Sequence, residues 1–172
     1  MGVYFGTDGI RGKYGIKPIS EDFIYQFSIA LSEFLKKNNV VNNSEIVIGR
    51  DTRASGLNLE KPIKKAFEDS GFTILLLGVI PTAAVALKVK ESNAVLGLAI
   101  TASHNSALDN GVKVFNQDGE KLALSEELLI ESLINENYSY KKKPDEEPNY
   151  IGYEFYKNKV TSLVQNNAFR DF

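Results

Sequence analysis

Three polar segments carry the residues of this sequence whose types and spacing could do chemistry. They cover residues 5–12 (FGTDGIRG), 49–56 (GRDTRASG) and 101–105 (TASHN). The first two segments contain arginines, and a guanidinium matches two oxygens of a phosphate with parallel hydrogen bonds. We therefore predict that they bind an anionic ligand, and the alternative is a surface ion pair with a neighbouring aspartate. The arginines concerned are Arg11, Arg50 and Arg53.

Ser103 is the candidate nucleophile because it closely follows the apolar run 95–100, which predicts a buried strand. Thr101, His104 and Asn105 add hydrogen-bonding groups that packing alone does not require. A turn or helix-cap role is the alternative for Ser103. His104 is its direct neighbour, and neighbouring side chains of an extended chain point to opposite sides. A serine-hydrolase pair is therefore excluded, although His104 could still orient or protonate a ligand.

Lys113 is the candidate cation beside Ser103. It lies in the short apolar run 112–115, a predicted strand in which the two valines share one face and Lys113 shares the other with the phenylalanine. The sequence Asp109-Asn110-Gly111 predicts a tight turn that folds this strand back towards Ser103. There the lysine would balance the charge of a phosphate or, when desolvated, give up a proton more readily. A solvated lysine at a strand edge is the alternative.

Helices and strands that could position these residues alternate along the chain. The patterns predict helices over 20–37, 57–70, 81–91 and 150–165, and strands over 45–48, 72–77, 95–100 and 112–115. Apolar strands separated by helices indicate a sheet covered on both faces. We predict the α/β class, as a three-layer α/β/α domain with a mixed, mainly parallel sheet. If their strands run parallel, segments 49–56 and 101–105 converge outside the carboxyl ends of the sheet.

The composition limits the classes of protein and site. The 172 residues are 43% hydrophobic and 24% charged, as in one ordinary globular domain. Cysteine is absent and histidine occurs once, which excludes disulfides, thiolate metal sites and multi-histidine metal sites. The net charge of −2 argues against a nucleic-acid partner. Neither a signal peptide nor a transmembrane run is evident, so we expect a cytoplasmic protein without a membrane partner. No oligomeric state is indicated.

A polar, proline-broken stretch divides the chain near its end. We predict a domain over 1–140, a linker over 141–149 (KKKPDEEPN) and a helix within 150–172 that leads towards a second domain outside this sequence.

Four segments together resemble the N-terminal domain of the α-D-phosphohexomutase superfamily: FGTDGIRG at 5–12, GRDTRASG at 49–56, GVIPT at 78–82 and ITASHNSALDNGVKVF at 100–115. The first two are most similar to the bacterial phosphoglucosamine mutase branch, with phosphomannomutases and phosphoglucomutases as alternatives. The resemblance implies interconversion of a hexose 6-phosphate and a hexose 1-phosphate, here of glucosamine, through a phosphoserine and a sugar bisphosphate. A non-catalytic anion-binding module of the same fold is the competing interpretation.

The resemblance also implies roles for individual residues. Ser103 would carry the phosphoryl group and ligate Mg²⁺ through it, Lys113 would be the general base, and Arg11 and His104 would contact the reacting phosphate or sugar. The remaining candidates would bind the substrate or its phosphate: Arg50, Arg53, Thr101 and Asn105. A sugar bisphosphate is the expected activator.

Two features depart from the family pattern. Ser106 stands where proline is usual, and Ala107 stands where an aromatic residue is common. Family enzymes also have four domains, and the other magnesium ligands, the sugar-selecting loop and a second phosphate loop lie in the later ones. We therefore expect negligible mutase activity from this chain without the missing C-terminal domains.

Overall fold

The computed structural model describes residues 2–40, 44–92, 94–142, 144 and 147–163. Its centre is a five-stranded sheet in the order β1-β5-β4-β2-β3. The strands are β1 (Ile10–Lys13), β2 (Glu45–Arg50), β3 (Thr73–Val79), β4 (Leu96–Ile100) and β5 (Asp109–Asn116). β2 pairs in parallel with β3 and β4, whereas β5 is antiparallel to β4 and β1. Only β5 therefore opposes the other strands, which confirms the predicted mixed, mainly parallel sheet.

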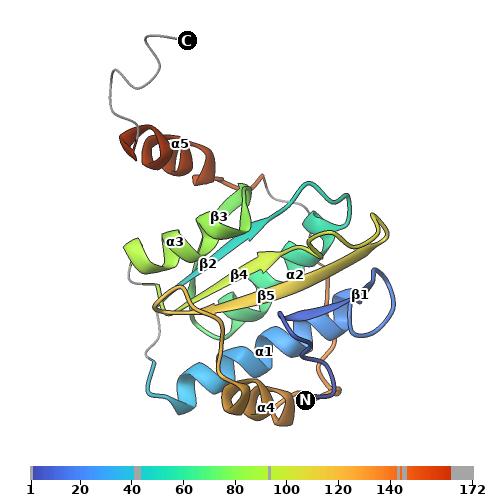
Figure 1. The fold of residues 1–172 in the computed structure, drawn as a ribbon. Helices are drawn as coiled ribbons and strands as arrows, with labels where there is room; N and C mark the ends of the chain where they lie inside the picture. Colours follow the sequence, from blue (N-terminus) through green and yellow to red (C-terminus); the bar gives the residue numbers. More distant parts are fainter. Residues whose placement is uncertain (1, 41–43, 93, 143, 145–146, 164–172) are drawn as a thin grey trace.

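Helices cover both faces of this sheet. They are α1 (Glu21–Lys37), α2 (Gly56–Asp69), α3 (Thr82–Ser92), α4 (Leu124–Ser132) and α5 (Gly152–Leu163). In Figure 1 α1 and α4 lie below the sheet, and α3 and α5 lie above it. No helix in the described part of the chain is both long enough and apolar enough to cross a membrane.

The alternation of side chains along β2 explains the layers. Ile46 and Ile48 face a large core that includes the aromatic side chains of α1 and α2. Val47 points to the opposite face, where it packs with a smaller cluster that includes Val85 and Val89 of α3. Successive side chains of a strand point to opposite faces, so one apolar strand supplies both cores. The predicted three-layer α/β/α arrangement is confirmed.

The predicted limits of α1 and α2 agree closely with the structure. Ser20 has an extended backbone, and its Oγ accepts a hydrogen bond from the Phe23 N–H at 3.3 Å, which satisfies one free donor of the first turn of α1. After α2, Gly71 takes a φ of 88°, a left-handed conformation that glycine adopts without a side-chain clash. The helix predicted over 150–165 is α5, and residues 164 and 165 lie outside the described residues.

The predicted turn over 109–111 is wrong, because these residues are the first three of β5 and pair with β1. The chain reverses instead within residues 101–108. β1 was not predicted as a strand, because its four residues contain a single apolar side chain. The fully buried Asn110 is satisfied in the strand, since its amide nitrogen donates to Ser55 Oγ at 2.8 Å. The pairing of β5 with β1 thus determines the backbone conformation of Asn110 more strongly than the turn propensity of this residue does.

Candidate functional site

Ser103 lies in a tight loop just beyond the C-terminal end of β4. Its φ is 58°, and Asn39 is the one other non-glycine residue with positive φ in the described part of the chain. For a residue with a side chain the left-handed conformation costs about 1–2 kcal/mol. The Ser103 N–H donates to Thr101 Oγ1 at 2.9 Å, while the Ser103 side chain is exposed. Such strain persists where surrounding contacts impose it, and it often marks a functional residue.

Asp51 ties the end of β2 to this loop. Its Oδ2 accepts a hydrogen bond from the Thr101 hydroxyl at 2.7 Å, and its Oδ1 accepts one from the Arg53 N–H at 2.9 Å. The Asp51 N–H in turn donates to the Ile100 carbonyl at 3.0 Å. The parallel pairing of β2 with β4 therefore brings segments 49–56 and 101–105 together, as the sequence predicted.

The first polar segment adds two cations around one carboxylate. Asp8 Oδ2 lies 2.9 Å from Arg11 Nη2 and 2.6 Å from Lys113 Nζ. Burial alone would raise the pKa of Asp8, but the hydrogen bond from Lys113 and the charges of Lys113 and Arg11 outweigh it and lower that pKa. One negative charge thus faces two positive charges, which leaves a net attraction for an anion. Arg11 Nε is buried without a hydrogen-bond partner among the described residues.

Gly111 lets this cationic cluster approach the serine loop. It pairs with Arg11 of β1, and its carbonyl accepts a hydrogen bond from the Thr101 N–H at 2.9 Å. A Cβ at position 111 would lie 2.8 Å from the Thr101 carbonyl oxygen and 2.9 Å from Arg11 Cγ. The absence of a side chain therefore allows the Arg11 stem to cross beside the start of the loop that carries Ser103.

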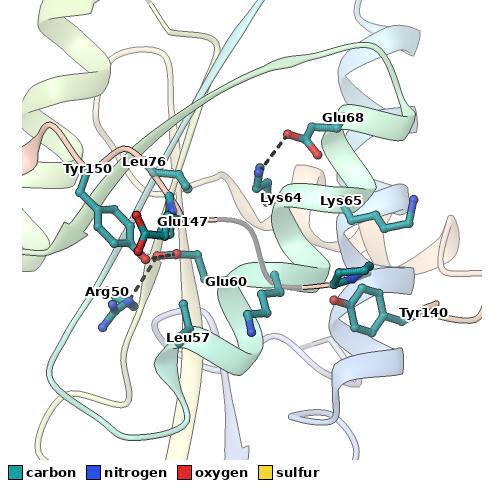
Figure 2. Close-up of a pocket in the computed structure, with 13 residues that line it drawn as sticks. Arg50, Leu57, Glu60, Lys64, Lys65, Glu68, Leu76, Tyr140, Glu147 and Tyr150 are labelled. Carbon is teal, nitrogen blue, oxygen red and sulfur yellow. Dashed lines mark hydrogen bonds and ion pairs between the residues drawn. The ribbon is translucent and has the colours of Figure 1, made fainter. Parts of the chain in front are cut away.

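Arg50 is directed elsewhere. Its Nε lies 3.3 Å from Glu60 Oε2, its guanidinium carbon lies 5.6 Å from the centre of the Tyr150 ring, and Tyr150 donates its hydroxyl to Glu60 Oε1 at 2.7 Å. Figure 2 shows the three side chains pointing towards one another at a cavity of about 420 Å³. Burial raises the pKa of Glu60 and outweighs the opposite effects of Tyr150 and Arg50. None of the described contacts joins the Arg50 side chain to the serine loop.

The other candidates lie in or under that loop. His104 is exposed, and the Asn105 side chain donates to Asp109 Oδ2 at 3.2 Å. Arg53 is nearly buried, with 11% of its side chain exposed, and its guanidinium contacts backbone carbonyls of the loop, including those of Ser103 and Asn105. Arg53, Thr101, Ser103 and Asn105 therefore form one connected group. Arg11 and Lys113 form a second group around Asp8.

Glu131 of α4 positions the first polar segment and was not predicted. Its carboxylate accepts hydrogen bonds from three consecutive backbone N–H groups, those of residues 3, 4 and 5, each at 2.7 Å. The acidic pair Glu126-Glu127 is typical of a first helical turn and could have revealed α4. Glu126 indeed accepts a hydrogen bond from the Ala123 N–H at 2.7 Å. The partner of Glu131 is more than 120 residues away in sequence, so no local pattern indicates it.

The described residues hold no group of three or more histidine, cysteine, aspartate or glutamate side chains that could bind a metal ion. A phosphorylated Ser103 could supply one oxygen ligand to Mg²⁺.

Comparisons with known proteins agree with this architecture. Residues 2–141 match the family model for phosphoglucomutase/phosphomannomutase, alpha/beta/alpha domain I. The phosphoglucosamine mutases of Variovorax paradoxus and Bartonella henselae are 42% identical over 133 residues and 43% identical over 136 residues. These matches cover 77% and 79% of this chain but 29% of each relative. The chain therefore spans about three tenths of the length of these relatives.

Solved structures show the same fold. A protein of Thermus thermophilus assigned as a phosphomannomutase superposes with a TM-score of 0.80 at 24% identity, over 96% of this chain and 37% of that one. A phosphoglucomutase/phosphomannomutase family protein of Burkholderia thailandensis gives a TM-score of 0.63 at 18% identity, over 76% of this chain and 30% of that one.

Proposed function

Because this chain belongs to the phosphoglucomutase/phosphomannomutase family and carries its α/β/α domain I, we propose that Ser103 bears the phosphoryl group of a hexose-phosphate mutase. The observation that carries the proposal is the conformation of Ser103. An exposed hydroxyl is held in a strained left-handed turn beyond the end of a central strand, beside a cluster with excess positive charge. Strained residues of this kind cluster at active sites, which supports a chemical role for this serine.

The reaction proceeds as two phosphoryl transfers. A sugar hydroxyl oxygen attacks the phosphorus of phosphorylated Ser103, the bond from phosphorus to Oγ breaks, and Oγ is left as a hydroxyl after taking up a proton. The attacking hydroxyl loses its proton to a general base, for which Lys113 is the candidate in its neutral amine form. In the second transfer the Ser103 hydroxyl gives its proton to a base as Oγ attacks the other phosphate of the sugar bisphosphate. The bond from that phosphorus to the sugar oxygen breaks, and the released sugar oxygen takes up a proton. The net result moves the phosphate between C6 and C1.

The described cations fit the charge that this chemistry requires. Phosphoserine carries about −1.5 to −2 charges at neutral pH, and phosphoryl transfer depends mainly on positioning and on stabilisation of that charge. In the described part of the chain Arg11 forms an ion pair with Asp8 through Nη2, and its buried Nε has no hydrogen-bond partner, so a phosphate oxygen would satisfy a donor that the fold leaves open. Mg²⁺ would add charge stabilisation at the phosphate when bound, with its remaining ligands from the later domains.

Glucosamine phosphate is the proposed substrate, because the two relatives described above, at 42% and 43% identity, are phosphoglucosamine mutases. The alternative is a mannose or glucose phosphate, as the names of the structural neighbours suggest. We further propose that the protein acts in the cytoplasm and that a sugar bisphosphate activates it by phosphorylating Ser103. Mutase turnover by the 172-residue chain alone should be negligible, since it spans about three tenths of its relatives and cannot enclose a sugar.

A complementation assay tests the proposal. The chain is mixed with the later domains of the Bartonella henselae phosphoglucosamine mutase, supplied as a separate protein, and with glucosamine 1,6-bisphosphate. We expect intact-mass and peptide spectra to show one phosphate on Ser103, and glucosamine 6-phosphate to be converted. Ser103→Ala should abolish both signals, whereas Ser106→Ala in the same loop should retain them. Turnover that persists in Ser103→Ala would refute the assignment, and binding of the bisphosphate without phosphorylation would favour a non-catalytic module.

A further inference from the structure

Arg53 donates every N–H of its guanidinium to the protein. A guanidinium has five N–H donors. The Nε–H is directed to Asp51 Oδ2 at 3.1 Å. Nη1 donates to the carbonyls of Ser106 and Asp109, and Nη2 donates to the carbonyls of Ser103 at 2.9 Å and Asn105 at 3.0 Å. No donor of Arg53 therefore remains for a phosphate unless one of these bonds opens.

The bonds from Arg53 reach the residue that is strained. Ser103 is held on both sides of its Cα, because its N–H donates to Thr101 Oγ1 and its carbonyl accepts from Arg53 Nη2, both at 2.9 Å. The Thr101 hydroxyl donates to the same Asp51 Oδ2 that faces Arg53 Nε. The Asp51 carboxylate thus fixes both residues that hydrogen-bond to the Ser103 backbone, Thr101 and Arg53. Three carbonyls of the loop and the carbonyl of Asp109 at the start of β5 converge on a single, nearly buried cation.

We infer that Arg53 is a positioning residue that holds Ser103 in its left-handed conformation, and that it does not bind the substrate phosphate. The inference rests on the proposed role of Ser103 and departs from the expectation that Arg53 contacts a phosphate. Lysine cannot replace it, because an ammonium has three donors on one atom and cannot span four carbonyls and a carboxylate. Without the clamp, Ser103 relaxes to ordinary backbone angles and its hydroxyl leaves the position needed for transfer.

Kinetics of the complemented protein separate positioning from binding. For Arg53→Lys we expect the rate constant of Ser103 phosphorylation at saturating glucosamine 1,6-bisphosphate to fall at least tenfold, while KM changes less than about threefold. Thr101→Val removes the acceptor of the Ser103 N–H but keeps the side-chain volume. It should likewise lower the rate constant with little change in KM, and it replaces Arg53→Lys as the test variant if Arg53→Lys does not fold. A KM that rises tenfold at an unchanged rate constant would overturn the inference, because Arg53 would then bind the ligand.

A second experiment does not depend on phosphoryl transfer and uses the 172-residue chain by itself. Glycine adopts positive φ readily, so Ser103→Gly removes the strain that Arg53 opposes. In the chain with Ser103, we expect Arg53→Lys to speed hydrogen exchange at the amides of residues 103–105 about tenfold. In the Ser103→Gly chain the acceleration caused by Arg53→Lys should be at least threefold smaller. Ile63→Val, a buried change on α2 remote from the loop, should lower overall stability without this local effect. Equal acceleration in both backgrounds would overturn the inference.

The two proposals fail in different ways. If the complemented wild-type chain takes up no phosphate, the proposed function is refuted, and the exchange experiment still decides whether Arg53 holds Ser103. If phosphate is transferred but Arg53→Lys neither slows transfer nor loosens residues 103–105, the function stands and the positioning role is refuted.

Discussion

The buried contact between Tyr150 and Glu60 offers a sharp test of how the segment before α5 is attached. The Tyr150 hydroxyl donates to Glu60 Oε1 at 2.7 Å, and Glu60 is only 3% exposed. Nearby, the Ile151 N–H donates to the Leu76 carbonyl at 3.1 Å on the edge strand β3. Replacement of Tyr150 by phenylalanine keeps the ring against Arg50 but removes the donor, so the change isolates a single hydrogen bond.

The magnitude follows from the burial of the acceptor. A hydrogen bond to a charged group contributes about 1.5–3 kcal/mol, and the loss leaves a buried carboxylate less satisfied. Tyr150 is 36% exposed, so water replaces part of the lost contact and the lower end applies. We expect Tyr150→Phe to lower the free energy of unfolding by about 1–2 kcal/mol. At roughly 2–4 °C per kcal/mol for a chain of this size, Tm should fall by about 2–8 °C.

The same variant should change the pH dependence of stability. The pKa of Glu60 is raised from 4.5 in the folded chain, chiefly by burial. The folded chain therefore holds this proton more tightly than the unfolded chain does, and the free energy of unfolding falls as pH rises above about 4.5. The Tyr150 hydroxyl lowers that pKa, so its removal raises the pKa further. The destabilisation by Tyr150→Phe should thus grow from acidic to neutral pH.

Thermal unfolding of the 172-residue chain at several pH values measures both effects. Tyr153→Phe is the matched control, because Tyr153 lies on α5 and is 71% exposed. It should leave Tm within about 1 °C of the unmodified chain, as surface substitutions usually do. If Tyr150→Phe were no more destabilising than Tyr153→Phe at neutral pH, the argument that this hydrogen bond anchors the segment would be wrong.

Two further substitutions test the placement of the first polar segment. Gly9 and Gly15 both have positive φ, but a Cβ at Gly9 would lie 2.2 Å from the Val112 carbonyl oxygen, whereas one at Gly15 meets nothing within 4 Å. Gly9→Ala should therefore destabilise the chain by at least about 1 kcal/mol more than Gly15→Ala in chemical denaturation; equal losses would show that no close contact is made. Glu131→Gln replaces a three-fold acceptor, and it should speed hydrogen exchange of the amides of residues 3–5 about tenfold; unchanged rates would contradict that contact.

The sequence predicts the long amphipathic elements well because their information is local. The 17 residues of α1 repeat their apolar positions at helical spacing, and Ser20 marks the start. β1 carries no such signal, because four residues with a single apolar side chain do not make a periodic pattern. Its partner β5 lies about 100 residues later in the sequence. Because the two segments pair, residues 10–13, which were not predicted as a strand, and residues 109–111, which were predicted as a turn, form neighbouring strands.

The residue types of the candidate site could be recognised from the sequence, but their partners could not. Tyr150 and Glu60 are 90 residues apart, and neither lies in the three polar segments. Only Arg50, which contacts both of them, belongs to one of those segments. The strain at Ser103 is equally invisible, since serine is common in turns and its φ follows from contacts made by Thr101 and Arg53.

The number of donors that the fold has already used distinguishes arginines that look alike in sequence. Arg53 has given all five to the protein, and Arg50 faces a buried carboxylate and an aromatic ring. Among the described residues the buried Nε of Arg11 and the buried Nε of Arg50 both lack a hydrogen-bond partner. Arg50 Nε nevertheless lies 3.3 Å from Glu60 Oε2, whereas Arg11 pairs with Asp8 through Nη2, so only the Nε of Arg11 has no carboxylate assigned to it. An anion gains most from a donor that is already desolvated and unpaired, because water need not be displaced from it and no internal bond need break. Arg11 is therefore the arginine of the described chain best suited to hold a phosphate, while Arg53 shapes the loop on which the phosphoserine would stand.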